Sequence, residues 1–279
     1  YYGNKIASNR KICLINKGAK RRIFRWICQV FLTKKWGILI KKESESLIFT
    51  GLKIPRDYFS MRRKRKMLYN MKEILAVAKE HKFAIPAFNV ADWSMFLGIM
   101  DECEATNSPV IIEIHPDELA FEGPDMVGAI RQRALKSKVP VCIHLDHCSN
   151  FGTIIEAIQC GFTSVMFDGA SLPFEENIAG AKKVVEAAHP VNVSVEAELG
   201  TIGSTNPDDL EGGAAQIIYT DPDDAVKFVE ATGVDTLAVA IGTCHGLYPA
   251  GMKPELKLDI LKEIEAKVNV PLVDRKSVV

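Results

Sequence analysis

The chain has 279 residues, of which 47% are hydrophobic and 25% charged, and its formal net charge is zero. A chain of this length and composition can bury a large core, which argues against a disordered polypeptide. The charge is unevenly divided, because residues 1–70 carry 19 of the 35 Lys and Arg residues but 3 of the 35 Asp and Glu residues. We therefore expect the chain to consist of two unrelated segments, a basic one at the N-terminal end and an acidic one after it.

Residues 1–66 form a basic extension that we expect to be non-native or disordered. Its apolar stretch, residues 22–40, is interrupted by basic side chains, which excludes a membrane span, and no cleavage pattern of a signal peptide follows. Its Lys, Ile, Asn, Phe and Tyr bias resembles translated AT-rich DNA, and Met67 and Met71 are candidate starts. The alternative is a nucleic-acid-binding arm centred on the basic run at 62–66.

The seven cysteines indicate a reducing compartment, and we expect the protein to be cytoplasmic. Their number is odd, and no Cys-x-x-Cys pair occurs. Cys142 and Cys160 lie in apolar surroundings and are expected in the core. Cys244 adjoins a polar cluster but has no evident general base, so we do not expect it to be a nucleophile.

From residue 71 onward, helical and strand patterns alternate. In chain order they predict helix 71–81, strand 83–90, helix 92–107, strand 109–115, helix 126–136, strand 140–147, helix 151–160, strand 164–168, helix 174–189, strand 193–199, helix 221–232, strand 236–242, helix 255–267 and strand 268–273. Nearly continuous apolar strands separated by helices favour a parallel sheet buried on both faces. Without a Gly-x-Gly-x-x-Gly opening, they predict an α/β protein with a (β/α)8 TIM barrel.

This barrel is expected to be incomplete. Residues 67–273 supply strands one to six and the start of strand seven, whereas strand eight is missing. The residues that follow, Asp-Arg-Lys-Ser-Val-Val at 274–279, match the translation of a common sequencing adapter. We therefore expect an artefactual tail after residue 273.

Polar side chains follow the apolar strands where each strand ends. They are Asn89, His115, Asp146 with His147, Asp168, Glu196 with Glu198, and His245. Barrel enzymes keep their active sites at this end of the strands. Zinc accepts imidazole and carboxylate ligands, so His147 and His245 predict a shared zinc ion. Asp168 and Glu198 are expected either to bind the metal or to orient an imidazole, and His144 to support the site from inside the barrel.

Six motifs in order make residues 67–273 resemble the class II, metal-dependent ketose-bisphosphate aldolases of the fructose and tagatose group. They include Pro-Ala-Phe-Asn, His-Leu-Asp-His and Gly-Thr-Cys-His-Gly, and they occupy residues 86–89, 109–112, 144–147, 164–168, 194–200 and 238–246. The resemblance implies reversible cleavage of a ketose 1,6-bisphosphate to dihydroxyacetone phosphate and glyceraldehyde 3-phosphate. It also implies a homo-oligomer when the chain is intact.

The resemblance assigns roles residue by residue. Asp146 would be the catalytic acid and base, and His147 and His245 would be zinc ligands. Gly246 and Asn89 would bind the phosphorylated sugar. Two further residues, Asp168 and Glu198, match positions linked to an alternate or structural metal site, so a second divalent or monovalent cation is also implied.

The chain departs from the family pattern after strand seven. The third zinc ligand of the family is a His just beyond Pro-Leu-Val, where this chain has Asp274 and Arg275. The phosphate loop and strand eight that should follow are absent, so we expect the chain as it stands to be inactive. The loop at 200–220 is expected to close over the substrate, with Asp208, Asp209 or Glu211 handling a second proton.

Three other functions compete with that of an aldolase. A Schiff-base aldolase needs a Lys at a strand end, and no predicted strand ends in Lys. A metal hydrolase on this barrel commonly has His-x-His on strand one, where this chain has Phe88, Asn89 and Val90. The third alternative is an inactive fragment or a protein that binds nucleic acid through its basic arm, and such binding would weaken with salt.

Overall fold

The computed structural model describes residues 67–201, 203–204, 218–242, 244–245 and 255–273. The basic extension and residues 274–279 lie outside these ranges, so the domain boundaries predicted there remain predictions. Most of the loop at 200–220, with Asp208, Asp209 and Glu211, also lies outside them.

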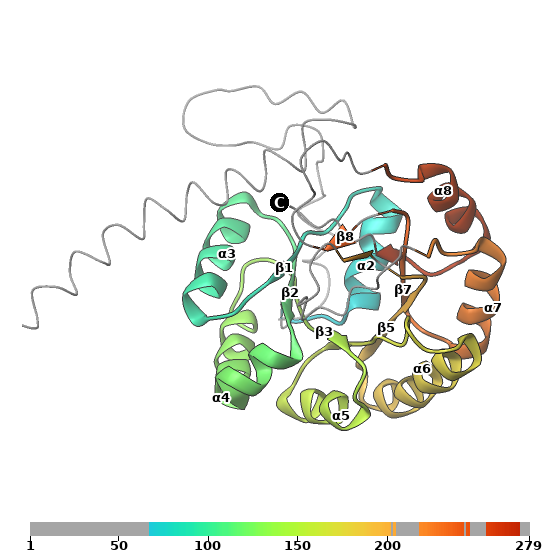
Figure 1. Cartoon of the computed structure of the whole chain (residues 1–279). Helices are drawn as coiled ribbons and strands as arrows, with labels where there is room; N and C mark the ends of the chain where they lie inside the picture. The colour runs from blue at the N-terminus through green and yellow to red at the C-terminus, as the bar shows by residue number, and fades with distance from the viewer. Residues whose placement is uncertain (1–66, 202, 205–217, 243, 246–254, 274–279) are drawn as a thin grey trace, which may run out of the picture.

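Seven parallel strands form one sheet that curls into an incomplete barrel (Figure 1). In spatial order they are β1 (Ala87–Asn89), β2 (Val110–Ile114), β3 (Val141–Cys148), β4 (Ser164–Phe167), β5 (Ser194–Leu199), β7 (Thr236–Val239) and β9 (Leu272–Val273). A separate parallel pair joins β6 (Gly203–Ser204) to β8 (Cys244–His245). Because a helix lies between each strand of the large sheet and the next, the predicted architecture, an incomplete (β/α)8 barrel, is confirmed.

Helices cover the outer face of the sheet (Figure 1). They are α3 (Trp93–Thr106), α4 (Pro116–Ala134), α5 (Phe151–Cys160), α6 (Phe174–Ala188) with the short 3-10 helix η1 (His189–Val191), α7 (Pro222–Thr232) and α8 (Leu258–Lys267). Side-chain oxygens of Asp92, Asn150 and Asp221 accept hydrogen bonds from the first turns of α3, α5 and α7. Such caps satisfy amides that a helix start leaves without intrahelical partners. None of the helices in the described ranges is long and apolar enough to cross a membrane.

Helix α4 begins at Pro116, well before the predicted start at residue 126, so that boundary was wrong. His115 caps the helix, and its backbone N–H donates a hydrogen bond to the Glu118 carboxylate, which forms a capping box. Gly123, with φ of 75°, then interrupts the helix just before Pro124. This Gly-Pro break hid the first half of the helix from a reading of periodicity.

Helix α2 (Met71–His81) closes the N-terminal end of the barrel. Met71 and Ile74 pack against Ile111 and Cys142 near the starts of β2 and β3. The backbone N–H of Met71 also donates to Ser194 Oγ at the start of β5. With this end filled by apolar side chains, the opposite end of the strands is left for polar chemistry.

Candidate active site

Strand β3 places an acid and an imidazole side by side through a bulge. Leu145 pairs with Val165 and Cys148 with Phe167, so three steps along β3 match two along β4. Within this bulge His147 has a φ of 49°. Adjacent side chains of a regular strand point to opposite faces. The bulge therefore lets Asp146 and His147 both turn toward polar partners at the end of the barrel.

His147 lies against two carboxylates from the neighbouring strands. Its Nδ1 is 2.8 Å from Asp168 Oδ2, just after β4, and 3.9 Å from Glu198 Oε2 on β5. The side chains of His147 and Glu198 are each 4% exposed. One ligand atom from each of these three residues lies within 4.8 Å of the others. The sequence-predicted His147, Asp168 and Glu198 therefore form one cluster.

Asp146 is buried beside this cluster and is held by Asn89 from β1. The Asn89 Nδ2 donates to Asp146 Oδ2 at 3.0 Å, and Asp146 is 2% exposed. An amide donor on one carboxyl oxygen fixes the plane of the carboxyl group. Asn89, predicted as a substrate-binding residue, thus lies where it can also orient the predicted acid.

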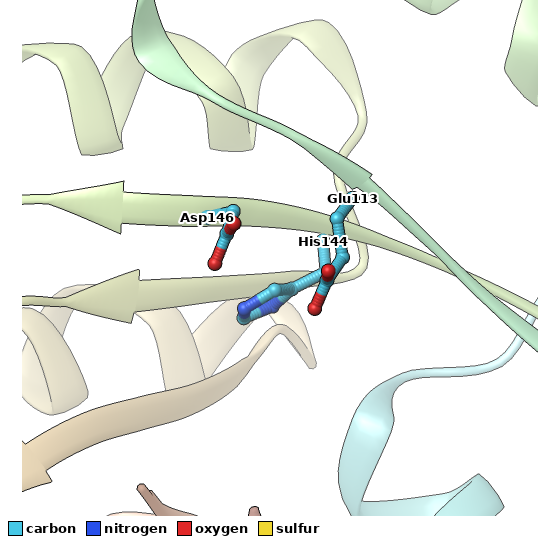
Figure 2. Close-up of side chains that lie close together, drawn as sticks. All are labelled: Glu113, His144 and Asp146. Atoms are coloured by element: carbon cyan, nitrogen blue, oxygen red, sulfur yellow. The ribbon is translucent and has the colours of Figure 1, made fainter. Parts of the chain in front are cut away.

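A second polar cluster lies deeper in the barrel (Figure 2). Glu113 on β2 and His144 and Asp146 on β3 each bring one ligand atom within 4.8 Å of the others. His144 Nδ1 is 2.9 Å from Ser164 Oγ, and its Nε2 is 3.6 Å from Glu196 Oε2 on β5. The His144 side chain is fully buried inside the barrel, and its role in supporting the site stays a prediction.

The electrostatics of this cluster are dominated by buried negative charge. Burial, followed by repulsion from Glu113 and Glu198, raises the pKa of Glu196 to about 8. We did not predict Glu113, although an acid inside the apolar run Val110–Ile114 is a readable signal. Such an acid must find a polar partner when its strand is buried.

Other predicted residues have different surroundings or fall outside the description. His115, grouped with the strand ends in the sequence, accepts a hydrogen bond from the Asp117 N–H at the start of α4, so it serves as a helix cap. The backbone of His245 pairs in β8 with Ser204, but its side chain and all of Gly246 lie outside the described residues. Cys142 is fully buried, and burial raises the pKa of its thiol to about 12, as fits a core residue.

The cluster of His147, Asp168 and Glu198 has the chemistry of a divalent metal site. One imidazole and two carboxylates converge at a partly buried position, and these are ligand types that zinc accepts. A carboxylate at Nδ1, as Asp168 provides, is the usual way in which a protein orients a metal-binding imidazole through its other nitrogen. The residues present therefore fit a divalent cation in either of two positions. One lies between His147 Nδ1 and the two carboxylates, and the other lies at His147 Nε2, with Asp168 orienting the ring.

Comparison with known proteins agrees with this geometry. The family model for class II fructose-bisphosphate aldolase matches residues 69–274. The chain is 41% identical over 211 residues to the fructose-bisphosphate aldolase of Staphylococcus aureus, covering 74% of this chain and 72% of the relative. It is 39% identical over 207 residues to the D-tagatose-1,6-bisphosphate aldolase subunit GatY of Klebsiella oxytoca, with the same coverage.

Solved structures give the same result. The crystal structure of the YdjI aldolase from Escherichia coli K12 matches with a TM-score of 0.65 and 36% identity, over 74% of this chain and 72% of that one. A putative fructose-1,6-bisphosphate aldolase from Coccidioides immitis matches with a TM-score of 0.68, 30% identity and the same coverage. By sequence and by fold, this chain belongs to the class II fructose-bisphosphate aldolase family.

Proposed function

We propose that this protein reversibly cleaves a ketose 1,6-bisphosphate into dihydroxyacetone phosphate and glyceraldehyde 3-phosphate. The observation that carries the proposal is the position of buried Asp146 beside the cluster of His147, Asp168 and Glu198, in a chain of this family. An aldol cleavage needs both a base near a hydroxyl group and a positive centre near a carbonyl group. The two neighbouring groups can supply these functions together.

Zinc is the cation that we propose for the cluster, with His147 as a ligand and His245 as a second. Asp168 would orient the His147 ring through Nδ1, and Glu198 would either bind the cation or hold it in an alternate position. A bound divalent cation polarises the ketone oxygen and stabilises the negative charge that develops there.

Asp146 is the proposed proton acceptor. In the cleavage direction its carboxylate takes the proton of the C4 hydroxyl group, C4 becomes an aldehyde, and the C3–C4 bond breaks. The electron pair of that bond passes to the three-carbon fragment that holds the ketone, which then takes up a proton at C3. In the reverse direction Asp146 returns its proton to the new hydroxyl oxygen.

The substrate, the residues that bind it, the oligomeric state and the cellular location are also proposals. The named substrates of the two relatives, fructose and tagatose 1,6-bisphosphate, differ at the C4 stereocentre, next to the proposed position of Asp146. We propose a phosphorylated sugar bound in part by Asn89 and Gly246, a homo-oligomer of the intact chain, and a cytoplasmic location. The location is supported by the odd number of cysteines, seven, among which no Cys-x-x-Cys pair occurs.

The test is a cleavage assay with each bisphosphate, on the chain as it stands and on a version extended to the full length of its relatives. We expect the extended version to cleave at least one substrate, to lose activity with a chelator and to regain it with zinc. Borohydride added with substrate should not trap a covalent adduct. A substrate adduct on a Lys, found by mass spectrometry, would replace this mechanism with Schiff-base chemistry.

A further inference from the structure

Helix α6 carries a buried amide on a face that is otherwise apolar. Its buried residues are Asn177, Ala181, Val184 and Ala188, which recur at helical spacing. Asn177 is 2% exposed. The N-cap residue of α6 is Pro173, and this helix start has no side-chain cap in the described structure, so Asn177 is not a cap. Its burial therefore points to a role at the sheet.

One end of the Asn177 amide reaches the end of β5. Its Nδ2 donates a hydrogen bond to the backbone carbonyl oxygen of Glu198 at 2.9 Å, and both groups are buried. The pairing of β4 with β5 ends one residue earlier, at Phe167 and Ala197. Asn177 therefore supplies a donor to β5 where β4 no longer runs beside it, and this bond holds the backbone that carries the Glu198 carboxylate.

The other end of the amide lies against the turn that follows β4. Asn177 Oδ1 is so close to Gly169 that a Cβ atom at that position would overlap it, and Gly169 directly follows Asp168. This oxygen is buried and has no hydrogen-bond partner among the residues that the structure describes. A buried carbonyl oxygen without a partner is costly, so an apolar side chain would suit this position better if packing were its only role.

We propose that Asn177 is a positioning residue for the cluster of His147, Asp168 and Glu198. This one side chain ties the end of β5 to the turn after β4, and it thereby fixes the two carboxylates relative to each other and to the imidazole. The distances of 2.8 Å and 3.9 Å from His147 Nδ1 to the two carboxylates depend on it. Its effect on a bound cation rests on the proposed function, whereas its effect on the contact between His147 and Asp168 does not.

The first experiment measures cobalt binding to the 279-residue chain after chelator treatment, by titration of the visible absorption of Co²⁺. This ion takes the same imidazole and carboxylate ligands as Zn²⁺, and its absorption reports their geometry. We expect Asn177→Ala and Asn177→Leu to bind Co²⁺ about 10–100-fold more weakly than the parent, with a shifted spectrum, as loss of a residue that orients metal ligands usually does. His147→Ala should lose this binding.

Val184→Ala is the matched control. It removes a buried side chain from the same face of α6, two turns further along the helix than Asn177. It should lower the melting temperature in chelator, because it leaves a cavity, but keep the cobalt affinity and spectrum of the parent. Asn177→Leu retains most of the volume of the amide, so it separates loss of the hydrogen bond from loss of packing. Far-UV circular dichroism checks that each variant is folded.

A second measurement needs no metal. In the metal-free protein the ring proton between His147 Nδ1 and Asp168 is shielded from solvent, because the His147 side chain is 4% exposed. A shielded proton in a hydrogen bond to a carboxylate gives a low-field NMR signal, which His147→Ala should abolish. We expect both Asn177 variants to shift or broaden this signal and Val184→Ala to leave it unchanged.

The outcomes separate the role of Asn177 from the proposed function. If His147→Ala changes cobalt binding no more than Val184→Ala does, the metal assignment at His147 fails, and the low-field signal alone decides the role of Asn177. A positioning role is overturned if both Asn177 variants keep the cobalt affinity and the low-field signal of the parent. It is also overturned if Val184→Ala changes them as much, because general packing of α6 then explains the effect.

Discussion

Asp146 and His147 are adjacent in sequence, but each is held by a different strand. Asn89 on β1 holds the carboxyl group of Asp146, and Asp168 after β4 holds the imidazole of His147. Each side chain therefore has its own support, although both belong to β3. We expect a substitution at one of them to affect a different step from a substitution at the other.

We predict that Asp146→Asn lowers turnover of the extended chain by roughly 10²–10⁴-fold, the usual contribution of a general acid–base group. The amide has the shape of the acid but cannot accept the C4 proton. The variant should keep the cation that His147→Ala loses. Turnover is measured in a coupled assay, and metal is measured by mass spectrometry. Loss of the same cation in both variants would make Asp146 a ligand of the His147 site.

Glu196 gives a pH-dependent prediction for the metal-free protein. Its pKa rises from 4.5 unfolded to about 8 folded, chiefly through burial and then through Glu113 and Glu198. A raised pKa means that its stabilising contribution is complete below pH 4.5 and is lost as the pH rises to about 8. Glu196→Gln cannot ionise, so it should lose less stability than the parent between pH 5 and pH 8.

The size of this difference should be on the order of a few kcal/mol, because one pKa unit corresponds to about 1.4 kcal/mol. Urea unfolding at pH 5 and pH 8, with chelator present, measures it. If the free energy of unfolding has the same pH dependence in the two proteins, then burial does not raise the pKa of Glu196.

At the scale of elements, Asp235 joins several parts of the N-terminal end of the barrel. Its carboxylate lies just before β7 and accepts the backbone N–H of Val195 on β5 at 2.9 Å. It also lies 2.9 Å from Lys72 Nζ on α2 and 2.9 Å from His189 Nε2 on η1. The Asp235 side chain is 2% exposed, whereas that of Lys72 is 68% exposed. We therefore expect the partners of Asp235 to contribute unequally to the free energy of unfolding.

We predict that Asp235→Ala lowers the free energy of unfolding by about 1–3 kcal/mol, because the Val195 N–H is left buried without its acceptor. Lys72→Ala removes only an exposed ion pair and should cost less than about 1 kcal/mol. Urea unfolding of the two variants tests the difference. A loss in Lys72→Ala as large as that in Asp235→Ala would place the stabilisation in the ion pair.

At the scale of the whole molecule, the sheet has two edges among the described residues. Within the described ranges, β1 pairs with β2 alone and β9 with β7 alone. Ala87 and Asn89 on β1 are exposed. Strand edges of this kind expose backbone groups that favour association between chains.

We predict that extending the chain to the full length of the S. aureus relative raises its melting temperature and reduces its self-association. Further chain can pair with the edges and complete the layers of side chains inside the barrel. Calorimetry and analytical ultracentrifugation compare the two lengths. The prediction fails if the 279-residue chain is already as stable and as monodisperse as the extended one.

The order of helices and strands could be predicted from the sequence because each carries a clear local signal. Apolar runs mark the strands, and side-chain caps such as Asp92 and Asp221 mark helix starts. The start of α4 could not be predicted from periodicity, since the break at Gly123 and Pro124 interrupts the pattern. Local signals therefore predict which elements exist better than they predict where those elements begin.

Part of the candidate site depends on how neighbouring strands align with one another, which the sequence of a single strand does not determine. The motif around Asp146 and His147 could be recognised in the sequence, and the positions of Asp168 and Glu198 at strand ends could be predicted from it. The pairing of Glu113 with His144, and the approach of Glu196 from β5, depend on how β2, β3 and β5 align around the barrel. Long-range alignment of this kind does not follow from the pattern of any one strand.

The positive φ of His147 has a consequence for how this protein could change under selection. Among the described non-glycine residues with positive φ, Lys82, Asn107 and Asn192 end helices, whereas His147 lies within a strand. The left-handed conformation costs most residue types about 1–2 kcal/mol, and Gly or Asn adopts it more readily. Gly or Asn at position 147 would relieve the backbone, but it would also remove the contact between the imidazole and Asp168 and leave a space where the ring packs. Selection for heat resistance alone would act on the balance of these two effects, whereas selection for a metal-binding imidazole would keep the disfavoured backbone.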